Sequence, residues 1–271
     1  MRLLEGKKAL ITGVANERSI AYGIAKAFYT EGAQLLFTYA NEKLKSRVNE
    51  IAKEFGTDLT FECDVSEDGH IKSLVDHVKG LWGSLDIVVH SIAYAPRDEF
   101  NGGVIDTSRE GFKIAMDISV YSLIALTREL LPLMKGKNGS VLTLTYYGAE
   151  KVVPHYNVMG IAKSALESTV RYLAYDIAKE GHRINAISAG PVKTLAAYSI
   201  TGFHLLMEHT MKVNPFGRAI TIEEVGDVAA FLCSDWARAI TGEVIHVDNG
   251  YHIMGVFGRE EDIKKEVFEK S

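Results

Sequence analysis

The fold class is decided by residues 146–163, which read Tyr146-Tyr147-Gly-Ala-Glu-Lys-Val-Val-Pro-His-Tyr156-Asn-Val-Met-Gly-Ile-Ala-Lys163. An apolar stretch, Val141 to Thr145, precedes this segment, and a helical pattern from Asn157 to Ala178 follows its last turn. We therefore expect a strand that leads into a helix. In α/β enzymes such strand-to-helix junctions carry the chemistry.

Two side chains in this segment form a candidate catalytic pair. Tyr156 and Lys163 are two helical turns apart, so they share one face at about 10 Å along the helix axis. Helical side chains lean toward the N-terminus, which would bring the Lys163 ammonium toward the Tyr156 phenol. A nearby ammonium favours the phenolate and strengthens the phenol as a donor to developing negative charge. A half-buried tyrosine and a solvated lysine are the alternative that this pair alone leaves open.

The rest of the chain alternates between apolar runs and helical patterns. The expected strands are continuous apolar runs, which are typical of parallel strands buried on both faces. Without a linker or low-complexity segment, the alternation predicts one doubly wound Rossmann-like α/β domain over residues 1–271, with a central parallel sheet of about seven strands. The strands are expected at 9–12, 33–39, 59–65, 85–92, 141–145, 184–188 and 244–247, and the helices at 21–31, 41–55, 71–81, 107–134, 157–178 and 223–234.

Two regions interrupt this alternation. Residues 193–215 form a long apolar connection, which is often a lid in a compact domain, so we expect a substrate lid there. The sequence Thr221-x-x-Glu224 predicts a capping box for the helix that follows. The charged tail, residues 258–271, is expected to be a solvated helix or a frayed end.

Composition excludes several classes of function. The net charge of −5 gives no nucleic-acid signature, and no apolar run is long enough to cross a membrane. The first residues contain no secretory apolar region, and Cys63 and Cys233 are too few for a disulfide framework. The nine histidines form no ligand cluster, so no metal site is expected. A cytoplasmic enzyme with reduced cysteines is the expectation.

A dinucleotide site is expected where the first strand ends. Gly13 closes that strand, and Ser19 and Ile20 open the next helix, where backbone N–H groups and the Ser19 hydroxyl can bind phosphate. The spacing is not Gly-x-Gly-x-x-Gly, because the next glycine is Gly23. An ordinary strand–turn–helix connection is the alternative interpretation.

Two later strand ends would line the same crevice. Asp64-Val65 follows the third strand and Ser91-Ile92 follows the fourth, at the carboxyl edge where doubly wound sheets bind ligands. These residues could contact an adenine and a ribose. Each pair, taken alone, is equally compatible with a strand-end turn.

Together these motifs resemble the short-chain dehydrogenase/reductase superfamily. The main branch of that superfamily has its lysine four residues after the tyrosine, whereas here the spacing is seven residues and a further tyrosine, Tyr146, lies upstream. This pattern resembles the enoyl-acyl-carrier-protein reductase branch of bacterial fatty-acid synthesis, over about residues 3–253. The motifs that carry the resemblance are Thr12-Gly13, Gly13-Val-Ala-x3-Ser19-Ile20-Ala21, His90-Ser91-Ile92, Ala95-Pro96, Tyr156-Asn-Val-Met-Gly, Arg183-Ile-Asn-Ala-Ile-Ser-Ala-Gly-Pro191 and Val247-Asp248.

The resemblance implies an NADH-dependent reduction of the trans-2 double bond of an enoyl thioester carried by acyl-carrier protein. It implies that Tyr156 donates to the thioester carbonyl, with Tyr146 beside it, and that Lys163 binds the nicotinamide ribose. Ala95, Tyr146 and Tyr156 would contact the substrate. The implied cofactor residues are Gly13, Ser19, Ile20, Ala40, Asp64, Val65, Ser91, Ile92, Lys163, Val192, Thr194, Leu195 and Ala196.

The chain departs from the family pattern near the adenine, in the stretch expected to dock the carrier protein, and at Asn249, where a second glycine is usual. The resemblance also bears on assembly. Ala40 replaces a longer polar residue that some relatives have near the adenine, and His204 is the one basic candidate for carrier-protein docking in residues 201–206. Glu42, with no arginine at the second strand end, disfavours a 2′-phosphate and favours NADH over NADPH. The helical stretches over residues 107–134 and 157–178 have more apolar surface than one sheet face can cover, which predicts a subunit interface. The family resemblance implies that the assembly is a homotetramer.

Two other functions remain open from the sequence. A carbonyl reductase or alcohol dehydrogenase of the same superfamily would use the same tyrosine and lysine, although the seven-residue spacing argues against it. A non-catalytic dinucleotide-binding member is the second alternative. Activity on a crotonyl thioester rather than a ketone, and NADH binding, distinguish the three.

Overall fold

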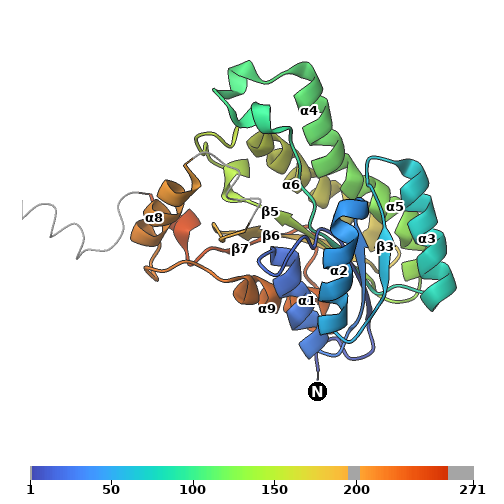
Figure 1. Ribbon diagram of the computed structural model, residues 1–271. Helices are drawn as coiled ribbons and strands as arrows, with labels where there is room; N and C mark the ends of the chain where they lie inside the picture. Colours follow the sequence, from blue (N-terminus) through green and yellow to red (C-terminus); the bar gives the residue numbers. More distant parts are fainter. Residues whose placement is uncertain (1, 195–201, 256–271) are drawn as a thin grey trace, which may run out of the picture.

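The computed structural model describes residues 2–194 and 202–255. Its seven strands form one sheet in the order β3-β2-β1-β4-β5-β6-β7, and every neighbouring pair is parallel (Figure 1). The single parallel sheet that the apolar runs predicted is therefore confirmed. The strands are β1 Lys8–Ile11, β2 Gln34–Tyr39, β3 Thr60–Glu62, β4 Ile87–His90, β5 Ser140–Thr145, β6 Arg183–Ala189 and β7 Val244–Val247.

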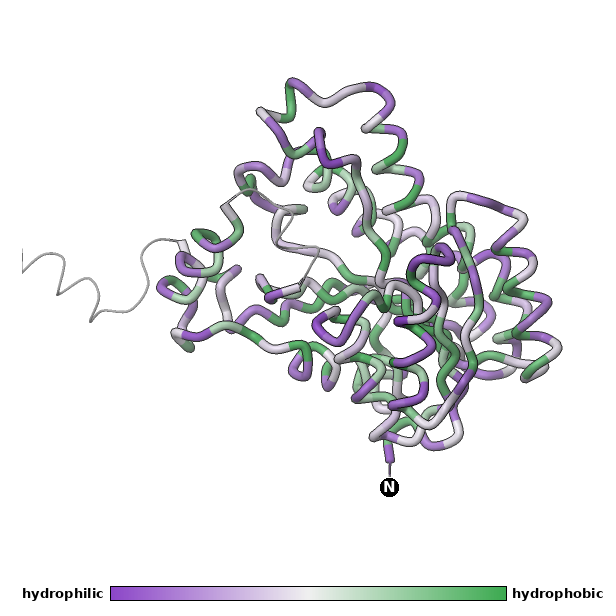
Figure 2. The backbone as a smooth tube through the Cα atoms, in the orientation of Figure 1, coloured by the Kyte–Doolittle hydropathy of each residue, from purple (hydrophilic) through white to green (hydrophobic). Residues whose placement is uncertain are grey.

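Helices cover both faces of the sheet and bury two separate apolar clusters. One cluster joins the sheet to α1, α2 and α9, and the other joins it to α3, α5 and α6. The green apolar strands at the centre of Figure 2, with purple polar residues on the outer faces of the helices, show the same layering. The helices are α1 Ile20–Thr30, α2 Glu42–Glu54, α3 Asp68–Trp82, α4 Arg109–Met116, α5 Ser122–Met134, α6 Asn157–Ala178, α8 Phe203–Val213 and α9 Ile222–Cys233.

Local chemistry sets the ends of several helices where the sequence indicated. The Ser19 side chain accepts from the Tyr22 N–H and caps α1. Thr221 and Glu224 form the capping box of α9 that their spacing predicted. Gly83, in the left-handed conformation at φ 66°, ends α3.

Helices α1 and α9 cross so closely that only glycine fits at the contact. A Cβ added at Gly226 would overlap the backbone carbonyl of Gly23, and one added at Gly23 would overlap that of Ile222. Close crossing brings the two helices onto the same face of the sheet, which fixes the direction in which α1 leaves the end of β1.

The structure differs from the expected elements in a few places. β3 has only 3 residues rather than the expected seven, because its outer position leaves it paired on one side. The helical stretch expected over 107–134 is divided by a π-helical segment, Asp117–Tyr121, between α4 and α5. The long connection at 193–215 contains α8, whereas 195–201 and the tail 258–271 lie outside the described residues.

The structure also bears on the membrane and on the thiols. None of the helices in residues 2–194 and 202–255 has the length and apolar character needed to cross a bilayer.

Cys63 and Cys233 are both free and buried, as expected. Burial raises the pKa of both thiols, to about 12 for Cys63 and about 11 for Cys233, so they stay protonated near neutral pH.

Candidate active site

The strand order reverses between β1 and β4. Doubly wound sheets bind ligands at the carboxyl edge beside such a switch point, and the carboxyl edge at β1 and β4 is called the crevice below. Thr12 joins the two strand ends, because its hydroxyl donates to the Val89 carbonyl at 3.0 Å and accepts from the Ser91 N–H at 3.2 Å. Gly13 follows with φ 79°, and a Cβ there would clash with the Ser91 carbonyl. A glycine is therefore required where the chain turns over the crevice.

The turn after β1 ends at the N-terminus of α1, which is one side of the candidate dinucleotide site. Asn16 organises this turn: its side chain accepts from the Arg18 N–H at 2.8 Å, and its carbonyl accepts from the Ser19 hydroxyl at 2.7 Å. Ser19 and Ile20 are half-buried at the helix start. α1 thus begins directly after the turn that closes β1, and a helix N-terminus at this place binds phosphate in dinucleotide folds.

The other predicted cofactor residues follow the strands that border the crevice. Ala40 is exposed after β2, Asp64 and Val65 follow β3, and Ile92 follows β4. The Asp64 carboxylate accepts from the N–H and hydroxyl of Ser66 at 3.0 and 2.7 Å, so one of its oxygens already holds the local turn.

The predicted contacts after β6 are described only in part. Val192 is buried, and the Thr194 N–H donates to the Val192 carbonyl at 2.8 Å in the connection toward α8. Leu195 and Ala196 lie outside the described residues.

Tyr156 and Tyr146 meet beyond the end of β5. Their rings contact edge to face, with centroids 5.1 Å apart and planes at 80°. Burial, followed by the neighbouring Tyr146, raises the pKa of Tyr156 well above its usual range. Burial also raises the pKa of Tyr146, with smaller effects of Tyr251 and Tyr147. Both phenols are therefore protonated at neutral pH, and the buried Tyr146 hydroxyl has no hydrogen-bond partner among the described residues.

Lys163 lies on the same helix but does not pair with the phenol. Its ammonium donates to the Leu144 carbonyl of β5 at 2.6 Å, and only 6% of the residue is exposed. Burial lowers the pKa of Lys163 to about 8, and the Glu167 carboxylate acts in the opposite direction. The expectation that the ammonium favours the Tyr156 phenolate is therefore wrong for this structure, because the backbone of β5 attracts the ammonium instead.

Two non-glycine residues in the left-handed conformation flank Tyr156. His155 has φ 64° and Asn157 has φ 42°. The Asn157 amide donates to the carbonyls of Glu99 and Gly102, at 3.1 and 3.4 Å. Because such backbone conformations persist only where the surroundings fix them, this turn holds the phenol in one orientation. Asn157, the first residue of α6, was not among the predicted site residues, because its bonds to Glu99 and Gly102 depend on how the chain folds back.

The π-helical segment fixes the loop that follows β4. Ser119, in this segment, accepts from the Tyr94 N–H at 3.0 Å and donates to the Tyr94 carbonyl at 3.1 Å. π-Helical insertions frequently occur at functional sites. Here the insertion turns Ser119 toward the segment that carries the predicted substrate contact, Ala95, which is buried. No sequence pattern distinguishes this segment from a continuous helix.

A buried histidine ties the same loop to the sheet. His90 Nδ1 lies 2.9 Å from the Thr143 hydroxyl, and Nε2 lies 2.8 Å from the Ser122 hydroxyl. Burial lowers the pKa of His90 to about 3, with the charge of Lys163 as the second cause. His90 is therefore neutral and links β4, β5 and α5 beneath the crevice.

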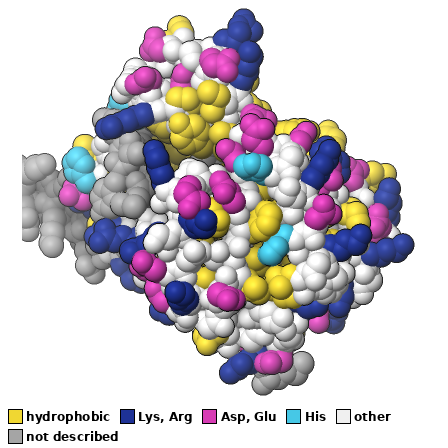
Figure 3. All heavy atoms as spheres, turned by 45° about the vertical axis from the view of Figure 1, so that its right-hand side comes forward, with side chains coloured by type: hydrophobic (Ala, Val, Ile, Leu, Met, Phe, Trp, Pro, Cys, Tyr) yellow, Lys and Arg dark blue, Asp and Glu magenta, His cyan; other side chains and the backbone are white. Residues whose placement is uncertain are grey.

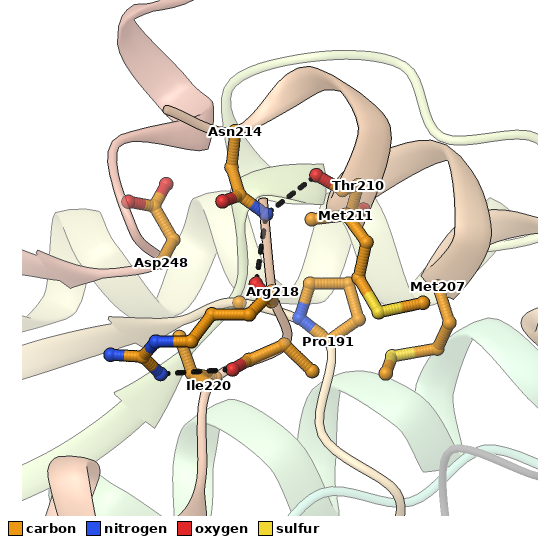
Figure 4. A pocket seen from close by; sticks show the side chains of 10 residues that line it. Pro191, Met207, Thr210, Met211, Asn214, Arg218, Ile220 and Asp248 are labelled. Atoms are coloured by element: carbon orange, nitrogen blue, oxygen red, sulfur yellow. Dashed lines mark hydrogen bonds between the residues drawn. The ribbon is translucent and has the colours of Figure 1, made fainter. Parts of the chain in front are cut away.

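Helix α8 borders the crevice on the β6 side. A pocket of about 10 Å³, room for about one water molecule, lies between α8 and Gly190-Pro191 (Figure 4). The Asn214 side chain donates to the carbonyls of Thr210 and Arg218, at 2.7 and 3.0 Å, and holds the C-terminal end of α8.

The arrangement suits a dinucleotide cofactor. The turn at Gly13 leaves no room for a side chain, and α1 begins directly after this turn. The buried Tyr146 hydroxyl has no hydrogen-bond partner among the described residues. A reduced nicotinamide supplies a hydride, and the paired phenols can donate to a carbonyl oxygen that becomes negative. Among the described residues, no group of three or more His, Cys, Asp or Glu side chains could hold a metal ion.

Comparison with protein families gives a match over nearly the whole chain. The family described as Enoyl-(Acyl carrier protein) reductase matches residues 13–252. The chain is 82% identical over 268 residues to "Enoyl-[acyl-carrier-protein] reductase [NADH] FabI" of Aquifex aeolicus (strain VF5), a match that covers 99% of each chain.

Solved structures give the same answer for the fold. The crystal structure of the Aquifex aeolicus VF5 enoyl-[acyl-carrier-protein] reductase (NADH) superposes with a TM-score of 0.92 and 82% identity, over 94% of this chain and 100% of that one. The Bacillus cereus enoyl-acyl carrier protein reductase, solved with NADP+ and indole naphthyridinone, also has a TM-score of 0.92, at 47% identity, over 94% of this chain and 100% of that one.

Proposed function

The chain belongs to the enoyl-(acyl carrier protein) reductase family, and from that premise we propose how its own residues carry out the reaction. It is an oxidoreductase that uses NADH to reduce enoyl thioesters in fatty-acid biosynthesis. The roles are assigned from one observation. The protonated phenols of Tyr146 and Tyr156 contact each other edge to face next to the crevice.

Tyr156 is the electrophile in this proposal. Bound NADH supplies the hydride that adds to C3 of the trans-2-enoyl thioester. Negative charge then develops on the thioester oxygen, and the protonated phenol of Tyr156 donates to that oxygen. The raised pKa keeps the proton on the phenol at neutral pH, so the hydrogen bond strengthens only as charge appears. Protonation at C2 completes the reduction.

Tyr146 and Lys163 have separate roles. The Tyr146 ring lies against that of Tyr156, and its hydroxyl, which has no partner in the part of the chain that the structure describes, provides a second donor or acceptor for the substrate. Lys163 keeps two ammonium protons beyond the one that it gives to the Leu144 carbonyl, and these bind the nicotinamide ribose hydroxyls.

The cofactor and substrate contacts follow the crevice. Gly13, Ser19 and Ile20 bind the pyrophosphate side, and the strand-end residues after β2, β3 and β4 border the adenine and ribose. The remaining proposed contacts lie on the nicotinamide and substrate side. Val192 and Thr194 would contact the nicotinamide, Ala95 would contact the substrate, and α8 would cover the acyl chain. The strand-end residues are Ala40, Asp64, Val65, Ser91 and Ile92.

The partner and the assembly extend the proposal. Acyl-carrier protein delivers the enoyl thioester.

A homotetramer is supported by the outer face of α6, where Tyr172 and Tyr175 are 76% and 84% exposed. Apolar side chains also gather near the top of the face in Figure 3. Phe112 of α4 and Ile105, which precedes α4, are exposed as well. A cytoplasmic location is proposed because NADH is used there. Light scattering that gave a monomer at micromolar concentration would refute the tetramer.

Oxidation of NADH, followed at 340 nm with crotonyl thioester as substrate, tests the function. Turnover with the thioester and none with simple ketones is the expected result. Turnover of a ketone alone would favour a carbonyl reductase instead, and a chain that does not bind NADH in a fluorescence titration would be a non-catalytic member.

A further inference from the structure

Two consecutive residues at the end of β5 hold two side chains of α6. The Leu144 carbonyl accepts from the Lys163 ammonium at 2.6 Å. The hydroxyl of the next residue, Thr145, donates to the Glu167 carboxylate at 2.7 Å. Lys163 and Glu167 are one helical turn apart, which puts their Cβ atoms about 5 to 6 Å from each other on the same face of the helix. The two side chains of α6 are therefore bonded to consecutive residues at the end of β5, and Figure 1 shows α6 lying along this strand.

Glu167 is a buried acid with no place in the mechanism described above. Only 8% of the residue is exposed, and the Thr145 hydroxyl is the one partner that its carboxylate has among the described residues. A buried carboxylate is unfavourable unless a hydrogen bond or an opposite charge compensates it. The ammonium of Lys163, one turn away, is the buried opposite charge on its own helix.

We propose that Glu167 is a positioning residue for Lys163: its buried carboxylate, fixed by Thr145, holds the ammonium charged against the end of β5. The proposal rests on the proposed function, in which the charged Lys163 binds the nicotinamide ribose. Glu167 touches neither substrate nor cofactor and acts only through the lysine.

The surrounding charges agree with this role. Burial lowers the pKa of Lys163, and Glu167 is the group that opposes this effect on its pKa. Burial raises the pKa of Glu167, and the Thr145 hydrogen bond lowers it. Three charged or titratable groups also act on this pKa: Glu150 after β5, Arg171 one turn further along α6, and His246 on β7.

Other titratable groups lie beside Glu167 and Lys163. His246 Nε2 lies 2.7 Å from the Glu150 carboxylate, so these two neighbours of Glu167 pair with each other. On the sheet side of Lys163 the titratable neighbour is His90, whose low pKa keeps it uncharged. Lys163 thus depends on Glu167 for its compensation.

The test compares Glu167→Gln with the wild-type protein. The glutamine keeps a carbonyl oxygen for Thr145 but removes the charge, so the pKa of Lys163 should fall by roughly one unit. If NADH binds only the charged lysine, a fall of one unit from about 8 makes binding about fivefold weaker at pH 8 and leaves it unchanged at pH 6. Glu167→Asp retains the charge and should restore most of the affinity at pH 8.

A measurement without cofactor gives an independent readout. The ε-carbon resonance of Lys163, assigned with Lys163→Arg in lysine-labelled protein, should titrate about one unit lower in Glu167→Gln than in wild type. The control is Asp176→Asn, which removes the same charge from an exposed position of α6 and should change neither the resonance nor NADH affinity.

Three results would overturn the proposal. The first is an unchanged titration of Lys163 in folded Glu167→Gln, and the second is an equal loss of NADH affinity at pH 6 and pH 8, which indicates general disruption. If the variant does not fold, the wild-type protein supplies the test. Its Lys163 resonance should then show a small step at acidic pH, where Glu167 takes up a proton. The third refuting result is the absence of this step. Failure of the proposed function is separate, because wild-type protein would then not oxidise NADH with enoyl thioesters at any pH.

Discussion

Replacing Lys163 with methionine should make the cofactor-free protein more stable at pH 7. Burial lowers the pKa of this lysine from 10.5 to about 8, and the shift is a net value that already includes the attraction to Glu167. At 1.36 kcal/mol per unit, holding the ammonium charged in the folded state is unfavourable by about 3 kcal/mol. Methionine has a similar length and loses one hydrogen bond, to the Leu144 carbonyl, worth about 1 kcal/mol. The net gain is about 2 kcal/mol, or roughly 6 °C in the melting temperature.

The gain should disappear as the pH rises. Below about pH 8 Lys163 is protonated in both folded and unfolded protein, so the full penalty is present. Between about pH 8 and 10.5 the folded protein holds fewer protons than the unfolded chain, so the stability of the wild type rises with pH. Above 10.5 neither state carries the charge. The difference between variant and wild type should therefore fall to near zero by about pH 9.5.

Thermal melts of wild type and Lys163→Met at pH 7 and pH 9.5, without cofactor, measure this difference. Titration with NADH completes the comparison, because the variant should gain stability while losing cofactor affinity. A variant that melts below the wild type at pH 7, or whose advantage does not change with pH, would refute the reasoning that Lys163 is a strained, functional charge.

Three further predictions concern other parts of the chain. Gly226→Ala should destabilise the protein by about 2 kcal/mol in urea unfolding, because its Cβ overlaps α1. In contrast, Gly80→Ala should be neutral or stabilising, because Gly80 lies in the last turn of α3 with open space around it. Thr221→Ala removes the cap shared with Glu224 and should lower the free energy of unfolding by about 1 kcal/mol; no change would exclude the capping box. With Glu42 at the start of α2, kcat/KM should favour NADH over NADPH, and equal values would contradict this.

The sequence predicted those features that depend on local patterns. Continuous apolar runs identified the strands, the helix over 157–178 begins and ends where its pattern did, and Ser19 caps α1 as its residue type indicated. These features follow from periodicity and capping chemistry within a few residues. The division of the helical stretch by the segment Asp117–Tyr121 escaped prediction, because nothing in its composition differs from a regular helix.

The direction of the Lys163 side chain could not be predicted for a different reason. Spacing along α6 places Tyr156 and Lys163 on one face, but it says nothing of the strand beneath. The acceptor is the backbone carbonyl of Leu144 in β5. Because every residue has such a carbonyl, the sequence does not indicate which one accepts this bond. Glu167 was missed although its spacing of four from Lys163 was visible, because its burial depends on how α6 packs against the sheet.

The central claim is that Tyr156 stabilises charge that appears only during reduction of the enoyl thioester. Its most direct test is single-turnover oxidation of NADH with crotonyl thioester by wild type and Tyr156→Phe, together with NADH titration of both. Loss of an oxyanion donor in another enzyme lowered turnover by roughly a hundredfold or more, so kcat should fall by about that factor while NADH affinity is unchanged. A Tyr156→Phe variant with wild-type turnover would contradict the account and transfer the role to Tyr146.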